Sequence, residues 1–213
     1  MSAAPPRAIP PSLFALSVFY GGMTCIAGVL GNKQVALGPL AVEAGIFAFL
    51  LLVVVSSAIA ELHGRAVANK LVIYGFVPLI ASVLLTLVVL AIPASAKMEP
   101  ERLAAFNLLM TGTPRIWLGG IVAYGVSMTL NVWLFDRLRG TGGRFVALRG
   151  AVASALSQIV DTLIFLSIAF YGVFPIGPLV GGQMIAKVSL SLLLVPFLIK
   201  GAVALGRRLD GGA

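Results

Sequence analysis

The chain has 213 residues, of which 60% are hydrophobic and 10% are charged, with a mean hydropathy of +1.08. Soluble domains carry about a quarter charged residues, so this composition excludes an ordinary soluble protein and indicates an integral membrane protein. The formal net charge of +8 is spread over connecting segments, which favours helix orientation over nucleic-acid binding as its role.

The chain reads in order as a short tail, six apolar stretches and a second tail. Residues 1–11 are proline-rich and are expected to be disordered, without the basic start of a cleaved signal peptide. Each stretch approaches or exceeds the ~20 residues of a membrane-spanning helix, the only credible structure at this length in lipid. We predict one six-helix transmembrane domain over 12–206 and a cytoplasmic tail over 207–213. The predicted spans are 12–30, 44–60, 71–93, 115–135, 150–172 and 178–205.

The longest connection between these spans covers residues 94–114. Within it, "PERLAAFNLLM" has apolar residues at helical spacing. This pattern predicts a short helix that lies in the membrane interface.

Lysine and arginine residues predict the orientation, because cytoplasmic loops are enriched in them. An N-terminus on the inside places ten of these residues in the cytoplasm and four outside, so both termini are predicted to be cytoplasmic. The cytoplasmic residues are Arg7, Arg65, Lys70, Arg137, Arg139, Arg144, Arg149, Lys200, Arg207 and Arg208, and the outer ones are Lys33, Lys97, Arg102 and Arg115.

Polar side chains gather on one face of the fifth predicted span. Ser154, Ser157, Gln158, Asp161 and Phe165 recur at intervals of three or four residues, which places them on the same side of a helix. Ionisable residues inside membrane helices usually face a bundle interior or an aqueous cavity and indicate function. This face is therefore predicted to line a cavity.

Lys187 in the sixth span is predicted to lie at a similar depth. At 1.5 Å per residue, Asp161 lies roughly 16 Å from one end of its helix and Lys187 roughly 13 Å from the opposite end of the next. In a hydrocarbon core ~30 Å thick, both are near the middle, so they are expected to pair or to flank one pocket. The alternative is an ion pair that serves packing alone, although buried pairs stabilise poorly compared with apolar replacements.

Each of the other polar residues has two possible interpretations, one functional and one structural. Lys33 and Glu61 are candidates for function or ordinary charges that reach the interface. Asn131 is a candidate gate or a link between helices. Among the aromatic residues, Tyr124, Trp133, Phe165 and Tyr171 are either packing groups or groups that stack on a ligand.

Several segments resemble the queuosine precursor transporters, also called the vitamin uptake transporter family. The most specific is "RGAVASALSQIVDTLIFLSIAF", 149–170, which is similar to the family's fifth-helix signature. The segments "AELHGRAVANKLV", 60–72, and "NVWLFDRLR", 131–139, resemble two further family motifs, and Lys187 and Asn32 match single positions. The chain departs from the family pattern in the second helix, where Leu50 replaces a proline and Ser57 an aspartate.

The resemblance implies import of a 7-deazaguanine such as preQ0 or preQ1 across the bacterial inner membrane, for salvage into the tRNA nucleoside queuosine. A carboxylate suits the adjacent N–H donors of a guanine-like edge, while an amide or lysine suits its carbonyl. The implied substrate-binding residues are Asp161, Gln158, Lys187, Asn32, Ser157 and Phe165. The residues implied in gating or helix anchoring are Arg149, Glu61 and Asn131.

Other functions remain open at this point. The six-helix topology is similar to the substrate-binding subunits of energy-coupling-factor vitamin importers, which need partner subunits. An intramembrane enzyme is disfavoured because the chain has one cysteine, one histidine and no clustered carboxylates. We expect no cofactor, no metal and no nucleic acid as partner, whereas a homodimer is an open alternative.

Overall fold

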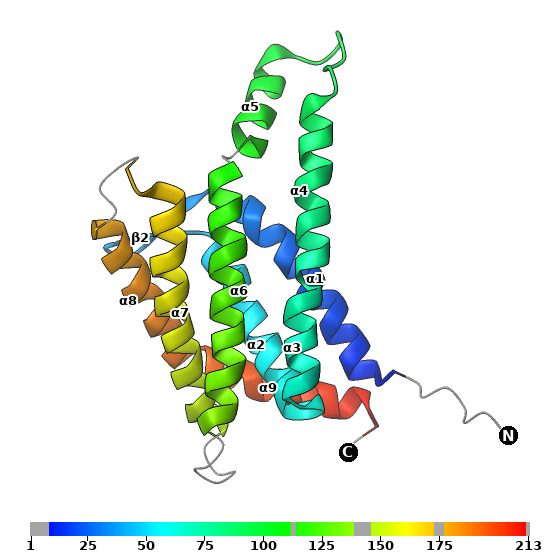
Figure 1. Ribbon diagram of the computed structural model, residues 1–213, viewed down its shortest axis with the longest axis vertical. Coiled ribbons are helices and arrows are strands. Elements are labelled where there is room, and N and C mark those ends of the chain that lie inside the picture. Colours follow the sequence, from blue (N-terminus) through cyan, green and yellow to red (C-terminus); the bar gives the residue numbers. More distant parts are fainter. Residues whose placement is uncertain (1–8, 112–113, 139–145, 173–176, 212–213) are drawn as a thin grey trace, which may run out of the picture.

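The computed structural model describes residues 9–111, 114–138, 146–172 and 177–211 as a helical bundle with one small hairpin (Figure 1). Within these residues, five helical segments are long and apolar enough to cross a membrane, and a bent helix pair can provide a sixth span. The prediction of an all-α membrane protein is confirmed at this level. The helices are α1 (Pro11–Leu30), α2 (Gly45–His63), α3 (Arg65–Tyr74), α4 (Phe76–Ala91), α5 (Pro100–Met110), α6 (Pro114–Arg137), α7 (Val146–Phe170), α8 (Gly177–Leu193) and α9 (Val195–Leu209).

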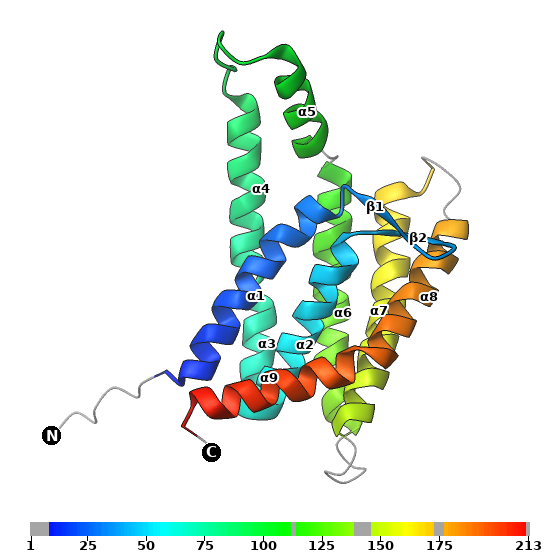
Figure 2. The same ribbon diagram turned by 180° about the vertical axis from the view of Figure 1, so that it is seen from behind.

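Helix α2 lies in the middle of the bundle and is the most buried of the candidate spans. It packs against α1, α3, α6 and α9, while α7 packs between α6 and α8 (Figures 1 and 2). The sequence of α2 is apolar all round, as expected for a helix covered by neighbours on every side. The polar face of α7 is therefore enclosed by helices rather than by lipid.

Helices α3 and α4 together form the third span, Arg65–Ala91, and meet at Gly75. A Cβ atom at Gly75 would lie 2.6 Å from Cε1 of Tyr20, so only glycine permits α1 to approach this closely. Beyond the end of α4, α5 folds back beside it at the end of the bundle opposite the two chain ends (Figure 1). The helix predicted in the 94–114 connection is therefore present.

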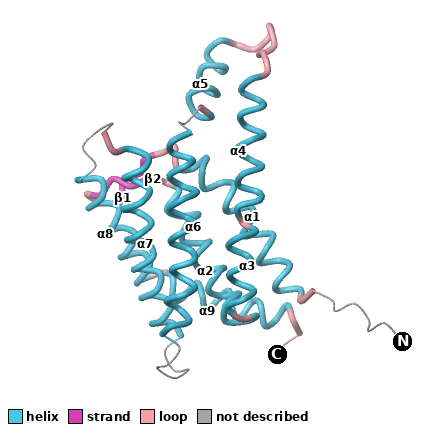
Figure 3. The backbone as a smooth tube through the Cα atoms, in the orientation of Figure 1, coloured by secondary structure: helices cyan, strands magenta, loops and turns pink. Residues whose placement is uncertain are grey.

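A two-stranded antiparallel hairpin joins α1 to α2 and was not predicted from the sequence. Strands β1 (Gln34–Leu37) and β2 (Leu40–Glu43) pair with Val35 opposite Val42, and β2 packs on α8 (Figure 3). The turn contains Gly38 with a φ of 60°, a left-handed conformation that glycine adopts without strain. Alternating apolar residues on both sides of the Gly-Pro turn were the available signal.

The predicted sixth span, 178–205, is two helices rather than one. Helices α8 and α9 are bent by 46° relative to each other, with Pro196 in the first turn of α9. Proline has no N–H group and its ring clashes with the carbonyl four residues earlier, which breaks a continuous helix. Helix α9 then crosses the lower part of the bundle on the side facing the viewer in Figure 2 and packs on α2.

The two ends of the described chain meet at one end of the molecule. Ser12 at the start of α1 donates hydrogen bonds to Asp210 after α9, from its backbone N (2.9 Å) and from its hydroxyl (2.6 Å). The Ser12 hydroxyl also lies 2.8 Å from Nε2 of His63 at the end of α2. Helix α9 extends to Leu209, and the predicted disorder of the N-terminal tail falls mostly on residues 1–8, outside the described residues.

Candidate substrate site

Asp161 of α7 and Lys187 of α8 form a buried ion pair in the interior of the bundle. Nζ of Lys187 donates a hydrogen bond to Oδ2 of Asp161 at 2.8 Å, and their side chains are 8% (Asp161) and 2% (Lys187) exposed. The second carboxylate oxygen, Oδ1, accepts a hydrogen bond from the Ser127 hydroxyl of α6 at 3.2 Å. The Lys187 ammonium also lies 5.1 Å from the ring centre of Phe49, a favourable cation–π contact. Depth predicted that the two residues pair or flank one pocket, and the structure shows both.

This ion pair borders a cavity of about 120 Å³. The cavity lies between α1, α2, α4, α6, α7 and α8, so nearly every span contributes to its wall. It is mainly apolar, with aromatic rings beside the few polar groups. The aromatic and charged lining residues are Glu43, Phe49, Tyr124, Asp161, Phe165 and Lys187.

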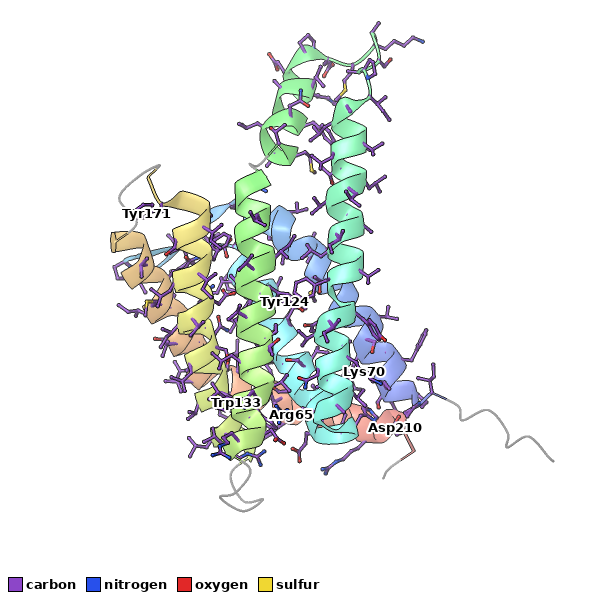
Figure 4. All side chains as sticks on the ribbon, in the orientation of Figure 1. Arg65, Lys70, Tyr124, Trp133, Tyr171 and Asp210 are labelled. Atoms are coloured by element: carbon purple, nitrogen blue, oxygen red, sulfur yellow. The ribbon has the colours of Figure 1, made fainter. Side chains whose placement is uncertain are left out.

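Tyr124 holds one side of this cavity in place. Its hydroxyl is hydrogen-bonded to that of Tyr20 in α1, and its ring packs edge-on against Phe76, with centres 5.2 Å apart. Figure 4 shows Tyr124 partway along α6, between the two ends of the helix. The aromatic wall is thus fixed by contacts with α1 and α4.

Glu43, the last residue of β2, is a cavity residue that sequence reasoning missed. Burial raises the pKa of its carboxyl group to about 7, with Lys187 acting to lower the pKa and Asp161 to raise it. The hairpin places this second acid beside the ion pair, although 118 residues of sequence (161 − 43) separate the two acids.

Gln158 and Ser157 lie next to Asp161 on α7 and are fully buried. The Ser157 hydroxyl donates to the Ala153 carbonyl, whereas neither amide atom of Gln158 has a hydrogen-bond partner in the described part of the chain. An unpaired buried amide is costly, so Gln158 is available to a polar ligand or to water. Phe165, one turn further along α7, lines the cavity.

Asn32 is not brought to the cavity. It is exposed, and its amide nitrogen donates to the carbonyls of Gly28 (3.2 Å) and Val29 (3.4 Å) at the end of α1. These carbonyls have no partner within the helix, so the local bond holds the side chain at the helix end. Trp133 and Tyr171 are also exposed and lie outside the cavity lining.

The residues predicted to gate or anchor lie nearer the end where the chain termini meet. Arg149 is buried, and its Nη2 atom donates a hydrogen bond to the Phe135 backbone carbonyl at 3.0 Å. Its guanidinium carbon lies 4.7 Å from the centre of the Phe135 ring. Asn131 is buried with both amide atoms unpartnered among the described residues. No ion pair of Glu61 occurs among those residues; instead, Arg65 pairs with Asp136 at 2.9 Å.

Comparison with known proteins identifies the family. Residues 43–201 match the family described as "Putative vitamin uptake transporter". This chain belongs to the vitamin uptake transporter family. It is 31% identical over 198 residues to the "Probable queuosine precursor transporter" of Bacillus subtilis (strain 168), covering 89% of this chain and 79% of that protein. No solved structure matches.

As a vitamin uptake transporter, the chain is a multi-pass protein of the bacterial inner membrane that carries a small molecule. The two departures from the family pattern both lie on the buried side of α2. Leu50 and Ser57 are each 2% exposed, and the Ser57 hydroxyl has no partner among the described residues. Neither residue lines the cavity beside Asp161.

Proposed function

We propose that this transporter imports a 7-deazaguanine precursor of queuosine, such as preQ0 or preQ1, and binds it at Asp161 and Lys187. The observation that carries the proposal is a buried carboxylate beside an ammonium at the edge of a cavity. A guanine-type edge presents adjacent N–H donors and one carbonyl acceptor, which these two groups complement. The name printed for the Bacillus subtilis relative supports the same substrate class.

The hydrogen-bond capacity of Asp161 fits this role. A carboxylate offers about four acceptor sites, and Ser127 and Lys187 occupy two of them. Two sites are left for the paired N–H donors of the substrate. Phe165 and Phe49 provide flat apolar surfaces on which the bicyclic ring can stack.

The size of the cavity indicates that the site must widen to take up substrate. An apolar cavity of about 150 Å³ accommodates benzene, and small-molecule pockets usually measure about 300–1,000 Å³. A cavity of about 120 Å³ is therefore a contracted form of the site. Widening toward Gln158 and Ser157, the next polar groups along α7, brings their side chains to the substrate.

The orientation of the chain in the membrane follows from the charge distribution. Arg65, Lys70 and Asp210 lie toward the end of the bundle where both termini are found, and Tyr171 lies at the opposite end (Figure 4). Cytoplasmic loops are enriched in lysine and arginine, so we assign the termini to the cytoplasm. The hairpin between α1 and α2 is then at the outer side.

The test is uptake in a host that lacks both its own precursor synthesis and its own uptake. Cells that express this chain are given each precursor, and queuosine in tRNA is measured. Asp161→Asn keeps the shape of the side chain but removes its charge, and we expect uptake to fall about 10- to 100-fold, as for a lost hydrogen bond to a charged group. Asp210→Asn is the matched control, since Asp210 lies outside the cavity, and should retain uptake.

The amount of protein in the membrane is measured for each variant. Normal uptake by Asp161→Asn, or the absence of queuosine with either precursor in cells that contain the wild-type chain, would contradict the proposal. Reconstitution of the purified chain alone in vesicles distinguishes a transporter that works by itself from the substrate-binding subunit of a multi-component importer. Precursor accumulation there shows that no partner subunits are needed, whereas binding without accumulation points to the subunit of a multi-component importer.

A further inference from the structure

Glu43 is held at the cavity by the hairpin and by the helix that follows it. Its backbone pairs with Gln34 across the hairpin, and α2 begins two residues later at Gly45. Its side chain lines the same cavity as Asp161 and Lys187. Because β2 packs on α8, which carries Lys187, the position of Glu43 is coupled to the helix of the ion pair.

Two glycines make room for the Glu43 carboxylate. A Cβ atom at Gly31 would lie 2.8 Å from its Oε2 atom, and one at Gly45 would lie 3.2 Å from both carboxylate oxygens. Any other residue at Gly31 would displace the acid. The carboxylate is thus fitted against bare backbone at the point where α1 ends and α2 begins.

The charges around Glu43 leave it without a cation of its own. Lys187 is bonded to Asp161, and the described residues contain no ion pair or hydrogen bond of the Glu43 side chain. With Asp161 and Glu43 ionised, the cavity has two negative groups and one positive group; Tyr124 is the other titratable residue in its wall. Nearby Lys33 is exposed and does not line the cavity.

The end of helix α1 beside Glu43 makes the surroundings of this carboxylate still more negative. The carboxylate sits at the C-terminal end of α1, where the helix dipole is negative and the last turn has no basic residue. An acid at this position is unfavourable until a cation arrives. Burial, which raises the pKa of Glu43 to about 7, points in the same direction.

We propose that Glu43 binds a positively charged arm of the substrate and makes the transporter selective for an aminomethyl 7-deazaguanine over its neutral nitrile counterpart. This inference rests on the proposed function. In this arrangement Asp161 and Lys187 form hydrogen bonds with the guanine-type edge, which both precursors share. The Glu43 carboxylate contacts the exocyclic group, which is an ammonium in preQ1 and an uncharged nitrile in preQ0.

The decisive measurement is the ratio of kcat/KM for preQ1 to that for preQ0, taken from initial uptake rates. We expect wild type to favour preQ1 and Glu43→Gln to lower the ratio about tenfold, the equivalent of about 1.4 kcal/mol. Glu101→Gln, an identical change at an exposed residue of α5, is the control. A fall of more than about threefold supports the assignment, and a smaller change overturns it.

The pH dependence of the wild-type chain tests the same inference without a variant. Glu43 must be ionised to attract an ammonium, so preQ1 uptake relative to preQ0 should fall as the outer pH drops below about 7. Glu43→Gln should remove this dependence of the ratio. An identical pH profile for both precursors in wild type overturns the inference.

A binding site for a coupling sodium ion is the competing role for Glu43. Replacement of external sodium by potassium tests it. Loss of uptake of both precursors in wild type, together with sodium-independent uptake in Glu43→Gln, would assign Glu43 to the ion and overturn the inference. If wild type takes up neither precursor in sodium, the proposed function fails. If wild type takes up both and Glu43→Gln keeps their ratio, only the role of Glu43 fails.

Discussion

Asp161 and Lys187 place opposite charges 2.8 Å apart in the interior of a membrane protein. Removal of one partner of a buried pair leaves an uncompensated charge, which costs about 3–5 kcal/mol. We therefore expect Lys187→Met to lower the free energy of unfolding in detergent by about this amount. The double variant Asp161→Leu/Lys187→Met removes both charges and should recover most of the stability, as measured by chemical unfolding.

The same double variant distinguishes packing from function. If the pair served packing alone, a stable double variant would transport normally. We expect it to be folded and inserted but inactive, because the acceptor for the substrate's N–H groups is gone. Restored uptake in the double variant would assign the pair to packing.

At the scale of the elements, a contact between Ser12, His63 and Asp210 joins the start of α1 to the ends of α2 and α9. Hydrogen bonds from Ser12, first from its side chain and then from its backbone, lower the pKa of Asp210, with a smaller contribution from His63. An acid whose pKa is lowered by folding stabilises the fold above its unfolded pKa of about 3.9, and the stabilisation is lost as pH falls through the folded value.

Ser12→Ala should therefore lower the thermal unfolding temperature at pH 7 but have little effect at an acidic pH below the lowered pKa of Asp210. As the pH falls through the lowered pKa of Asp210, the carboxylate takes up a proton, so the wild type loses the same interaction. Thermal unfolding of both proteins in detergent at the two pH values measures this difference. An equal effect at both pH values would show that the Asp210 charge is not involved.

Across the whole molecule, a group of buried polar side chains lies between the cavity and the chain termini. Gln158, Asn131 and Ser154 are buried there with unpartnered polar atoms among the described residues. Arg149, held by Phe135, lies beyond them at the start of α7. Buried polar groups without partners are unfavourable in a static bundle, which suits a route that is wet in another state of the transport cycle.

The reaction rate of a cysteine placed at position 154 measures how far water reaches between the cavity and the chain termini. In a Cys25→Ala background, which removes the single native cysteine, Ser154→Cys should react slowly with a water-soluble thiol reagent. We expect Arg149→Ala, which removes the contacts with Phe135, to raise the labelling rate at least about tenfold. Leu156→Cys, exposed on the outer face of the same helix, is the control and should not respond.

Equal labelling of Ser154→Cys with and without Arg149 would contradict a gating role and leave the arginine as a helix anchor. The amount of inserted protein is compared in both backgrounds. Because labelling is measured without substrate, the result does not depend on which precursor is carried.

Local properties of the sequence determined the class of the protein and the position of its spans. Hydropathy sets which segments can cross a bilayer, and helical periodicity put Gln158, Asp161 and Phe165 on one face of α7. Equal depth in neighbouring antiparallel helices was enough to predict that Lys187 pairs with Asp161 or flanks the same pocket. Pro196 was visible in the sequence, but hydropathy alone predicted one continuous helix where the structure has a bend between α8 and α9.

Only the tertiary structure decided which polar groups outside α7 and α8 reach the cavity. Glu43 enters because a hairpin folds against α8 and two glycines leave space for its carboxylate, whereas Asn32, nearby in sequence, bonds to the end of α1. Helix formation and membrane insertion depend on residues within a few turns of each other. The direction of a loop side chain depends on contacts between segments far apart in the chain, and no local pattern encodes those contacts.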